Sequence, residues 1–280
     1  MEKEHKLSLI DSSHGSVNLR EIWQYRDLLW LLVRRDFVAF YKQTIFGPVW
    51  FFIQPVFTTL VFIFLFSRVA GISTDGIPAP LFYLSGIILW NYFAECLLKT
   101  STVFKDNAHI FGKVYFPRLI MPLSIVFSNL IRFFVQLVLL LILIAYFAMQ
   151  STYEVKIGAY LLMLPVIVFL MAILGLGLGM IVSALTTRYR DLAFLLSFGV
   201  QLLMYATTVA YPLSAAPAQF KTFVALNPMS VLIESFRFCL FQSGSFSWLS
   251  FCAQALFVGL VFVIGAVIFT RQERSFMDTV

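Results

Sequence analysis

The residue types that usually carry catalysis are sparse in this 280-residue chain and are not arranged for it. The three histidines, His5, His14 and His109, are far apart, and no HExxH or Gly-x-Ser-x-Gly pattern occurs. The Walker A pattern that cradles ATP phosphates is also absent. We therefore expect no catalytic residues, no metal site and no ATP hydrolysis by this chain alone.

Two charged residues stand inside or beside apolar stretches, where a charge is costly and usually faces a partner or a wet cavity. Arg132 lies about a dozen residues into such a stretch, near mid-membrane on this count. Glu95 lies near the end of the preceding stretch and is a candidate partner. Three interpretations are open for Arg132: a structural ion pair, a role in transport, or snorkelling of its side chain to the interface.

Two apolar stretches each combine aromatic rings with amides and hydroxyls on one helical face. Rings can stack on the C–H faces of sugars while polar groups bond the sugar edges, so these faces could line a pathway for sugars. The alternative is ordinary packing between helices. The candidate channel residues are Phe51, Gln54, Thr58, Phe62, Phe194, Phe198, Gln201, Tyr205 and Thr208.

The elements that must position these residues are six charge-poor stretches. The chain is 60% hydrophobic and 12% charged, with a mean hydropathy of +0.89. About 20 apolar residues of helix cross a membrane, and only helices or closed barrels satisfy their backbone there. We predict an all-α polytopic membrane protein. The predicted transmembrane helices are Thr44 to Ser67, Leu81 to Leu98, Leu119 to Met149, Ile157 to Thr187, Leu192 to Pro212 and Leu249 to Thr270.

The basic residues predict the orientation. Of the 20 Lys and Arg residues, fifteen fall in segments on the side of the two termini, four fall on the opposite side, and Arg132 lies within a span. Cytoplasmic loops carry such an excess, so both termini are predicted to be cytoplasmic, and the basic charge does not indicate nucleic acid. We divide the chain into a cytoplasmic N-terminus (1–43), a transmembrane domain (44–270) and a cytoplasmic tail (271–280).

Two further segments do not fit plain spans. Charged residues and the aromatics Trp23, Trp30 and Phe37 each recur every seven residues between about 20 and 42, which predicts an amphipathic helix in the cytoplasmic interface. The segment Ala215 to Ser247 contains an apolar stretch, Met229 to Phe241, that is too short to cross and is interrupted by Glu234 and Arg237. We predict that this segment forms short re-entrant helices with a turn at Asn227 and Pro228.

Small residues and a mixed loop complete the pattern. Gly175 and Gly179 form a GxxxG, which predicts close helix packing. The loop between the second and third spans is aromatic as well as basic, so it is either an interaction surface or a membrane anchor. Its candidate residues are Phe104, Lys105, His109, Phe111, Lys113, Tyr115 and Arg118.

Five blocks, in one order, resemble the permease subunit of polysaccharide ABC exporters of the O-antigen and teichoic acid type. They are "RRDFVAFYKQTIFGPVWFFIQP" from Arg34, "KVYFPRLIMPLS" from Lys113, "RYRDL" from Arg188, "YPLS" from Tyr211 and "LNPMSVLIESFR" from Leu226. The similarity runs from about Arg20 to Thr270.

This resemblance implies a homodimer of six-helix subunits in the bacterial inner membrane, bound to two copies of a separate ATP-binding subunit. It implies that ATP and Mg belong to that partner, that no cofactor binds this chain, and that the loop from Lys105 to Arg118 couples to the ATPase. It also implies a channel between protomers, lined by the first and fifth spans, for a lipid-linked polysaccharide, with O-antigen preferred.

Alternatives to this interpretation are a teichoic acid or capsule exporter of the same family, an exporter of small hydrophobic drugs, and a membrane-embedded lipid or sugar transferase. A transferase would need carboxylates or histidines at a membrane face, and the chain offers few. A gene neighbourhood with an ATPase and glycosyltransferases would separate these functions.

Overall fold

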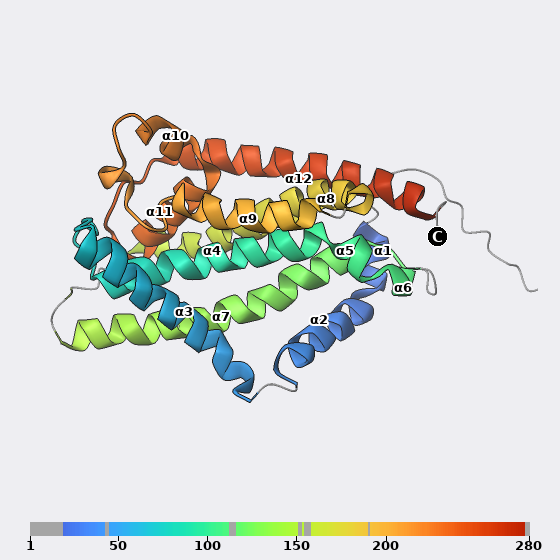
Figure 1. Ribbon diagram of the computed structural model, residues 1–280, viewed down its shortest axis with the longest axis horizontal. Helices are drawn as coiled ribbons and strands as arrows, with labels where there is room; N and C mark the ends of the chain where they lie inside the picture. The colour runs from blue at the N-terminus through green and yellow to red at the C-terminus, as the bar shows by residue number, and fades with distance from the viewer. Residues whose placement is uncertain are drawn as a thin grey trace, which may run out of the picture.

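The computed structural model describes residues 19–42, 45–111, 116–150, 153, 158–189 and 191–277, and the regular elements in these ranges are all helices (Figure 1). The α-helices are α1 (Leu19–Gln24), α2 (Arg26–Tyr41), α3 (Trp50–Phe62), α4 (Ala79–Ser101), α5 (Val103–Asp106), α6 (Ala108–Phe111), α7 (Ile120–Met149), α8 (Leu164–Arg188), α9 (Leu192–Tyr205), α10 (Lys221–Leu226), α11 (Pro228–Phe241) and α12 (Trp248–Met277). Four short elements are η1 (Gly47–Val49), the π-helix η2 (Ile63–Val69), η3 (Ala159–Met163) and η4 (Leu213–Ala215).

Five helical segments in the described ranges are long and apolar enough to cross a membrane. They are Gly47–Val69, Ala79–Ser101, Ile120–Met149, Ala159–Arg188 and Trp248–Gln272. The membrane class and the helical fold predicted from the sequence are confirmed. The stretch predicted as the fifth span contains α9, which has 14 residues and is therefore about 21 Å long, short of a ~30 Å hydrocarbon core.

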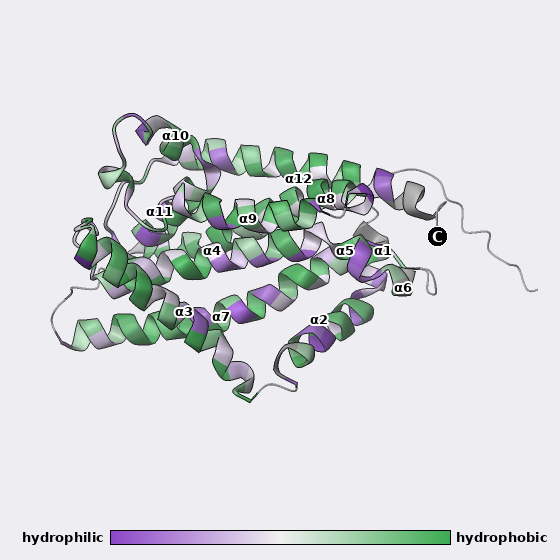
Figure 2. Cartoon of the chain, in the orientation of Figure 1, coloured by the Kyte–Doolittle hydropathy of each residue, from purple (hydrophilic) through white to green (hydrophobic). Residues whose placement is uncertain are grey.

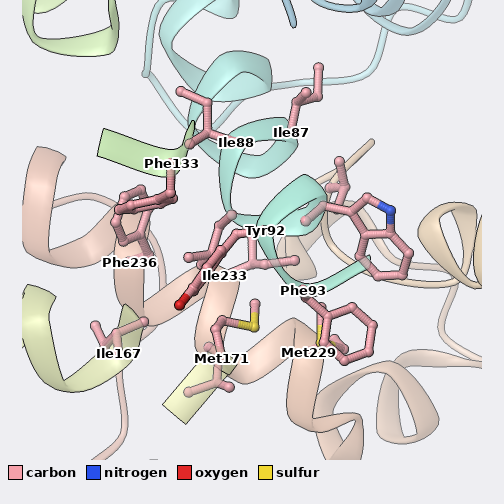
Figure 3. Close-up of a cluster of buried hydrophobic side chains, with 14 of the residues drawn as sticks. Ile87, Ile88, Tyr92, Phe93, Phe133, Ile167, Met171, Met229, Ile233 and Phe236 are labelled. Carbon is pink, nitrogen blue, oxygen red and sulfur yellow. The ribbon is translucent and has the colours of Figure 1, made fainter. Parts of the chain in front are cut away.

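Helix α4 lies at the centre of the bundle and packs against α3, α7, α8, α9 and α11. Its aromatic and aliphatic side chains meet those of three other helices in one buried cluster (Figure 3). The labelled members are Ile87, Ile88, Tyr92 and Phe93 from α4, Phe133 from α7, Ile167 and Met171 from α8, and Met229, Ile233 and Phe236 from α11. This core holds the other helices in position around α4.

Small residues bring α8 close to α4, as the GxxxG pattern predicts. A Cβ atom added to Gly179 would lie 2.6 Å from Cβ of Thr100, and one added to Gly175 would lie 2.9 Å from Cβ of Cys96. On the opposite face of α8, Gly177 lies against the backbone of α12 at Phe262. Glycine therefore permits two neighbouring helices to approach α8 more closely than any larger residue would.

The two ends of the bundle differ. At one end lie α1, α5 and α6, and we call it the α5 end; at the other lie α10 and α11, and we call it the α11 end (Figure 1). Many hydrophilic residues lie in α2 and at both ends of the bundle, whereas the long helices are mainly hydrophobic between the two ends (Figure 2). The helical N-terminal segment is broken at Tyr25 into α1 and α2, and α2 packs along α7.

The segment before α12 folds into the two short helices α10 and α11, with the predicted turn at Asn227. The Asn227 side chain caps α11 by accepting a 3.0 Å hydrogen bond from the backbone N–H of Met229. Tyr153, from the α7–α8 connection, donates a 2.9 Å hydrogen bond to the backbone oxygen of Phe241 at the end of α11. Burial raises the pKa of the Tyr153 hydroxyl, so it stays protonated as a donor.

Candidate functional site

Helix α9 presents an open aromatic face. Phe194 is 77% exposed and Phe198 is 58% exposed, and Gln201 and Tyr205 on the same face are also exposed. Val200 is the only buried residue of this helix. An amide that faces hydrocarbon loses its hydrogen bonds at a cost, so the position of Gln201 favours a polar pathway or a partner chain beside α9.

The matching stripe on α3 is divided by the fold. Gln54 is exposed and Thr58 half-buried, and Thr58 donates to the backbone oxygen of Gln54 at 2.9 Å. Phe51 and Phe62 are buried within the chain. Phe62 stacks on Tyr205 of α9 with ring centroids 6.3 Å apart, which joins the two stripes at one point.

Thr208 is also buried, and its hydroxyl donates to the backbone oxygen of Ser230 in α11 at 3.3 Å. In this conformation, Phe51, Phe62 and Thr208 hold helices together and do not face the outer surface of the chain. Phe51 lies against Phe37 of α2 and Arg132 of α7, Phe62 lies against Tyr83 of α4, and Thr208 lies against α11. Their place on a channel wall stays a prediction. The outward-facing members of the predicted set are Gln54, Phe194, Phe198, Gln201 and Tyr205.

Arg132 and Glu95 are brought together by α7 and α4. Nη1 of Arg132 lies 3.4 Å from Oε2 of Glu95, and Nζ of Lys99 lies 2.9 Å from the same oxygen. The Arg132 guanidinium also lies over the ring of Phe51, 5.5 Å from its centroid. Along the helix axes, Arg132 lies about 18 Å from the first residue of α7, and Glu95 lies about 9 Å from the last residue of α4. Both residues therefore lie in the half of the bundle nearer the α5 end.

These charges border a polar cavity between α3, α4 and α7. The cavity has a volume of about 100 Å³. Its polar lining consists of Gln54, Asn91, Glu95, Asn129, Arg132 and Gln136. A larger pocket of about 420 Å³ lies beside it, between α2, α5 and α7, and shares Asn129 and Arg132 with the cavity. Polar side chains therefore extend from the surface beside α2 into the bundle.

Helix α2 lies on α7 through an apolar face. Leu29, Leu32 and Val33 are buried, whereas Trp30 is 59% exposed, and Trp23 in the neighbouring α1 is 70% exposed. Trp30 contacts Phe127 of α7 with ring centroids 6.1 Å apart, and Phe37 contacts Phe51 of α3. The exposed tryptophans suit a helix whose remaining aromatic surface rests in a lipid interface.

The predicted coupling residues separate into two groups. Phe104 is buried and stacks on Phe269 of α12, with ring centroids 4.6 Å apart, and Arg118 is also buried. Lys105 in α5 is exposed. The side chains of His109 and Phe111, and residues Lys113 and Tyr115, lie outside the described part of the chain. Phe104 therefore anchors α5 to α12 and does not offer its ring to a partner.

A buried charge at the α11 end carries a structural role that the sequence pattern did not reveal. Arg237 is 1% exposed and donates to the backbone oxygens of Phe82, Thr208 and Val209, just where α9 has ended. Its Nη1 lies 3.5 Å from Oε1 of Glu234. From the sequence, Arg237 was predicted only as one of two charges that interrupt the apolar stretch Met229 to Phe241. The spacing of Glu234 and Arg237 by three residues, which puts both on one helix face, was the available signal.

Comparisons with known proteins agree with this architecture. Residues 27–241 match the family model described as ABC-2 type transporter. The chain is 32% identical over 222 residues to the O-antigen export system permease protein RfbA of Myxococcus xanthus, covering 78% of this chain and 82% of the relative. It is 26% identical over 253 residues to the protein of the same name from Klebsiella pneumoniae, covering 90% and 94%.

A more distant relative is the polysialic acid transport protein KpsM of Escherichia coli, 20% identical over 236 residues, with 83% of this chain and 88% of the relative covered. The resemblance inferred from the five sequence blocks is confirmed. The chain belongs to the ABC-2 type transporter family, as a membrane permease subunit and not an enzyme.

Proposed function

We propose that this chain is the membrane subunit of an ATP-driven exporter that moves a lipid-linked polysaccharide, O-antigen, out across the bacterial inner membrane. Two copies associate along α3 and α9, and each binds one separate ATP-binding subunit that supplies ATP and Mg. Both termini and the α5 end face the cytoplasm, and α10 and α11 lie as re-entrant helices near the outer mouth.

One observation carries this proposal: the similarity to permeases named for O-antigen export extends over most of the chain. The outward-facing rings and amides of α9 and the exposed Gln54 of α3 support it. A second copy placed against these faces would shield their rings from lipid and form a seam between the two copies that is lined by aromatic and polar side chains. Such a seam suits a linear sugar chain, because rings and amides can contact successive sugars without a fixed sequence.

The mechanism follows from this arrangement. Closure of the two ATP-binding subunits moves the coupling segment, which includes Lys105 and the residues up to Arg118. Because α5 is anchored to α12 through Phe104 and Phe269, that movement is transmitted to the bundle. The seam between α3 and α9 of opposite copies then opens, and the lipid-linked end of the glycan moves outward, followed by the chain.

The proposed function is tested by deleting the gene and labelling the cell's glycans. The expected result is accumulation of lipid-linked polysaccharide inside the cell and its loss from the surface, both reversed by the wild-type gene. Unchanged surface polysaccharide in the deletion strain would exclude the proposal. Accumulation of a lipid-linked teichoic acid would retain the exporter and replace its substrate, and a drug exporter would change drug resistance only.

The seam is tested by cysteine cross-linking. In a variant without Cys96, Cys239 and Cys252, Phe198→Cys should cross-link two copies, whereas Leu256→Cys on the exposed face of α12 should not. Both side chains are well exposed in the single chain, so exposure alone does not separate them. Equal cross-linking at both positions, or none at Phe198 in a complex that exports, would reject the seam.

The docking segment is tested by co-purification. Phe111→Ala with Tyr115→Ala should reduce recovery of the ATP-binding subunit with the permease, because the two rings stand in the segment proposed to dock on it. Unchanged recovery together with unchanged export would remove these two residues from the proposed docking surface.

A capsule polysaccharide is the second candidate substrate, because the chain also resembles the polysialic acid transport protein KpsM. The two substrates are distinguished by which surface polymer disappears when the gene is deleted.

A further inference from the structure

The polar cavity between α3, α4 and α7 contains a buried acceptor without a partner. Asn129 is 2% exposed, and its Oδ1 accepts no hydrogen bond from the described residues. Its Nδ2 makes one long contact of 3.9 Å, to the sulfur of Cys96. A buried acceptor without a donor costs free energy. Because Asn129 lines both the cavity and the neighbouring pocket, a ligand that brings hydroxyl donors would satisfy it.

The charges that the described residues contribute to the two pockets balance. Their charged lining is Arg35, Asp36, Glu95, Lys99, Asp106 and Arg132, three cations and three anions. Arg35 lies 2.8 Å from Asp36, and Glu95 is shared by Lys99 and Arg132. Because these charges sum to zero, the described lining offers a phosphate no net electrostatic attraction. A neutral ligand therefore fits the pockets better.

The remaining lining suits a ligand rich in hydroxyl groups. Gln54, Asn91, Asn129 and Gln136 supply amides that can both donate and accept hydrogen bonds. Phe51, Tyr92 and Phe133 supply ring surfaces around the same cavity. Amides together with rings match the edges and the C–H faces of a sugar. The cavity, at about 100 Å³, is much smaller than the adjoining pocket of about 420 Å³, so the larger pocket must hold most of a sugar ring.

The position of the pockets also suits a sugar attached to a lipid. The larger pocket borders α2 at Arg35, Asp36 and Ala39. With α2 in the cytoplasmic interface, this pocket opens at the level where the sugar next to a lipid anchor would lie. The smaller cavity reaches Gln54, which is exposed on the proposed seam.

We propose that these two joined pockets form a sugar-binding site that holds one sugar residue of the lipid-linked glycan at the cytoplasmic leaflet before the chain enters the seam. The amides of Asn129 and Gln136 bind hydroxyl groups of this sugar, and the Glu95–Arg132 pair holds α4 and α7 in position around it. This inference rests on the proposed function and adds to it a site in the single chain, separate from the surface between two copies.

The test measures dissociation constants for the complete transporter, with its ATP-binding subunits, in lipid nanodiscs. Three probes are used: the lipid-linked glycan extracted from the deletion strain, the glycan released from its lipid, and the lipid with its glycan removed. The variants are Asn129→Leu and Gln136→Leu. The matched control is Gln254→Leu in α12, which also replaces an amide but lies outside both pockets.

Each pocket variant should weaken binding of both glycan probes by about threefold to tenfold, the loss of one neutral hydrogen bond, and leave binding of the glycan-free lipid unchanged. The unfolding temperature of each variant is measured, and if one variant folds poorly, the other still tests the inference. Equal weakening for the glycan-free lipid would mean that the pockets bind the lipid headgroup, and no weakening at all would mean that they hold only water. Either result overturns the inference. If the wild-type transporter binds no lipid-linked glycan, the proposed function itself fails.

Discussion

Removing the guanidinium of Arg237 should lower the stability of the α11 end of the bundle more than removing any other single charge in that region. The change is Arg237→Met, which keeps most of the side-chain volume and loses the donors. Arg237 is 1% exposed and joins α11 to α4 through the backbone oxygen of Phe82, and to the end of α9 through the backbone oxygens of Thr208 and Val209.

The magnitude follows from the groups left behind. Arg237→Met leaves Glu234 buried without its cationic partner, and breaking a buried ion pair in this way costs about 3–5 kcal/mol. Glu234→Gln leaves Arg237 on its three carbonyl oxygens and keeps an acceptor beside it, so about 1–2 kcal/mol is expected. The double variant removes both charges, yet three carbonyl oxygens stay unpaired, so it should still lose about 3 kcal/mol at ~1 kcal/mol each.

The assay is the free energy of unfolding of the purified protein in mixed micelles with increasing SDS, followed by far-UV circular dichroism. Arg68→Met serves as the control, because Arg68 is exposed at the end of η2 and should change stability by less than about 0.5 kcal/mol. A loss below about 1 kcal/mol for Arg237→Met would refute the reasoning. Full recovery in the double variant would show that the carbonyl oxygens do not depend on this side chain.

Three further predictions concern other parts of the bundle. Gly179→Val should destabilise the protein by about 1–3 kcal/mol, because its side chain would clash with Thr100. The control is Gly259→Val in α12, where a Cβ atom meets open space, and it should not destabilise the protein in this way. Equal unfolding free energies for the two variants would contradict the close packing of α8 on α4. Phe104→Ala should lower the free energy of unfolding by about 3–5 kcal/mol, because its ring is buried. Lys105→Ala should leave stability unchanged and lower co-purification of the ATP-binding subunit, because Lys105 is exposed. The reverse pattern would place Phe104 on the docking surface. Arg132→Gln should lower the unfolding temperature more than Lys99→Ala, because the Lys99 side chain is far more exposed than that of Arg132, and differential scanning fluorimetry can compare the two.

Much of the architecture could be predicted from the sequence because the membrane restricts the backbone. A long apolar stretch in lipid has to form a helix, so most spans lie where hydropathy placed them. The turn at Asn227 and the close packing at Gly175 and Gly179 were also predictable, because a cap and a small-residue pattern act over a few neighbouring residues.

The faces of the helices were harder to predict. A stripe of rings and amides on α3 shows the same helical spacing in the sequence whether it lines a channel or packs against another helix. The spacing therefore does not identify what the stripe contacts. Phe51 proved to lie beneath Arg132, and Phe62 between α4 and α9. The polar cavity around Asn129 was not predicted, because its lining comes from three helices that are distant in the chain.

The sequence by itself determined that this is a helical membrane protein, because composition and span length act through the solvent and need no tertiary contact. Only the tertiary structure decided what the charged residues inside the bundle do. Arg237 binds the backbone oxygens of Thr208 and Val209 in the turn after α9, while Arg132 meets Glu95 beside a polar cavity. The physical reason is that the cost of a buried charge depends on which donors and acceptors surround it, and folding brings those groups together from different helices.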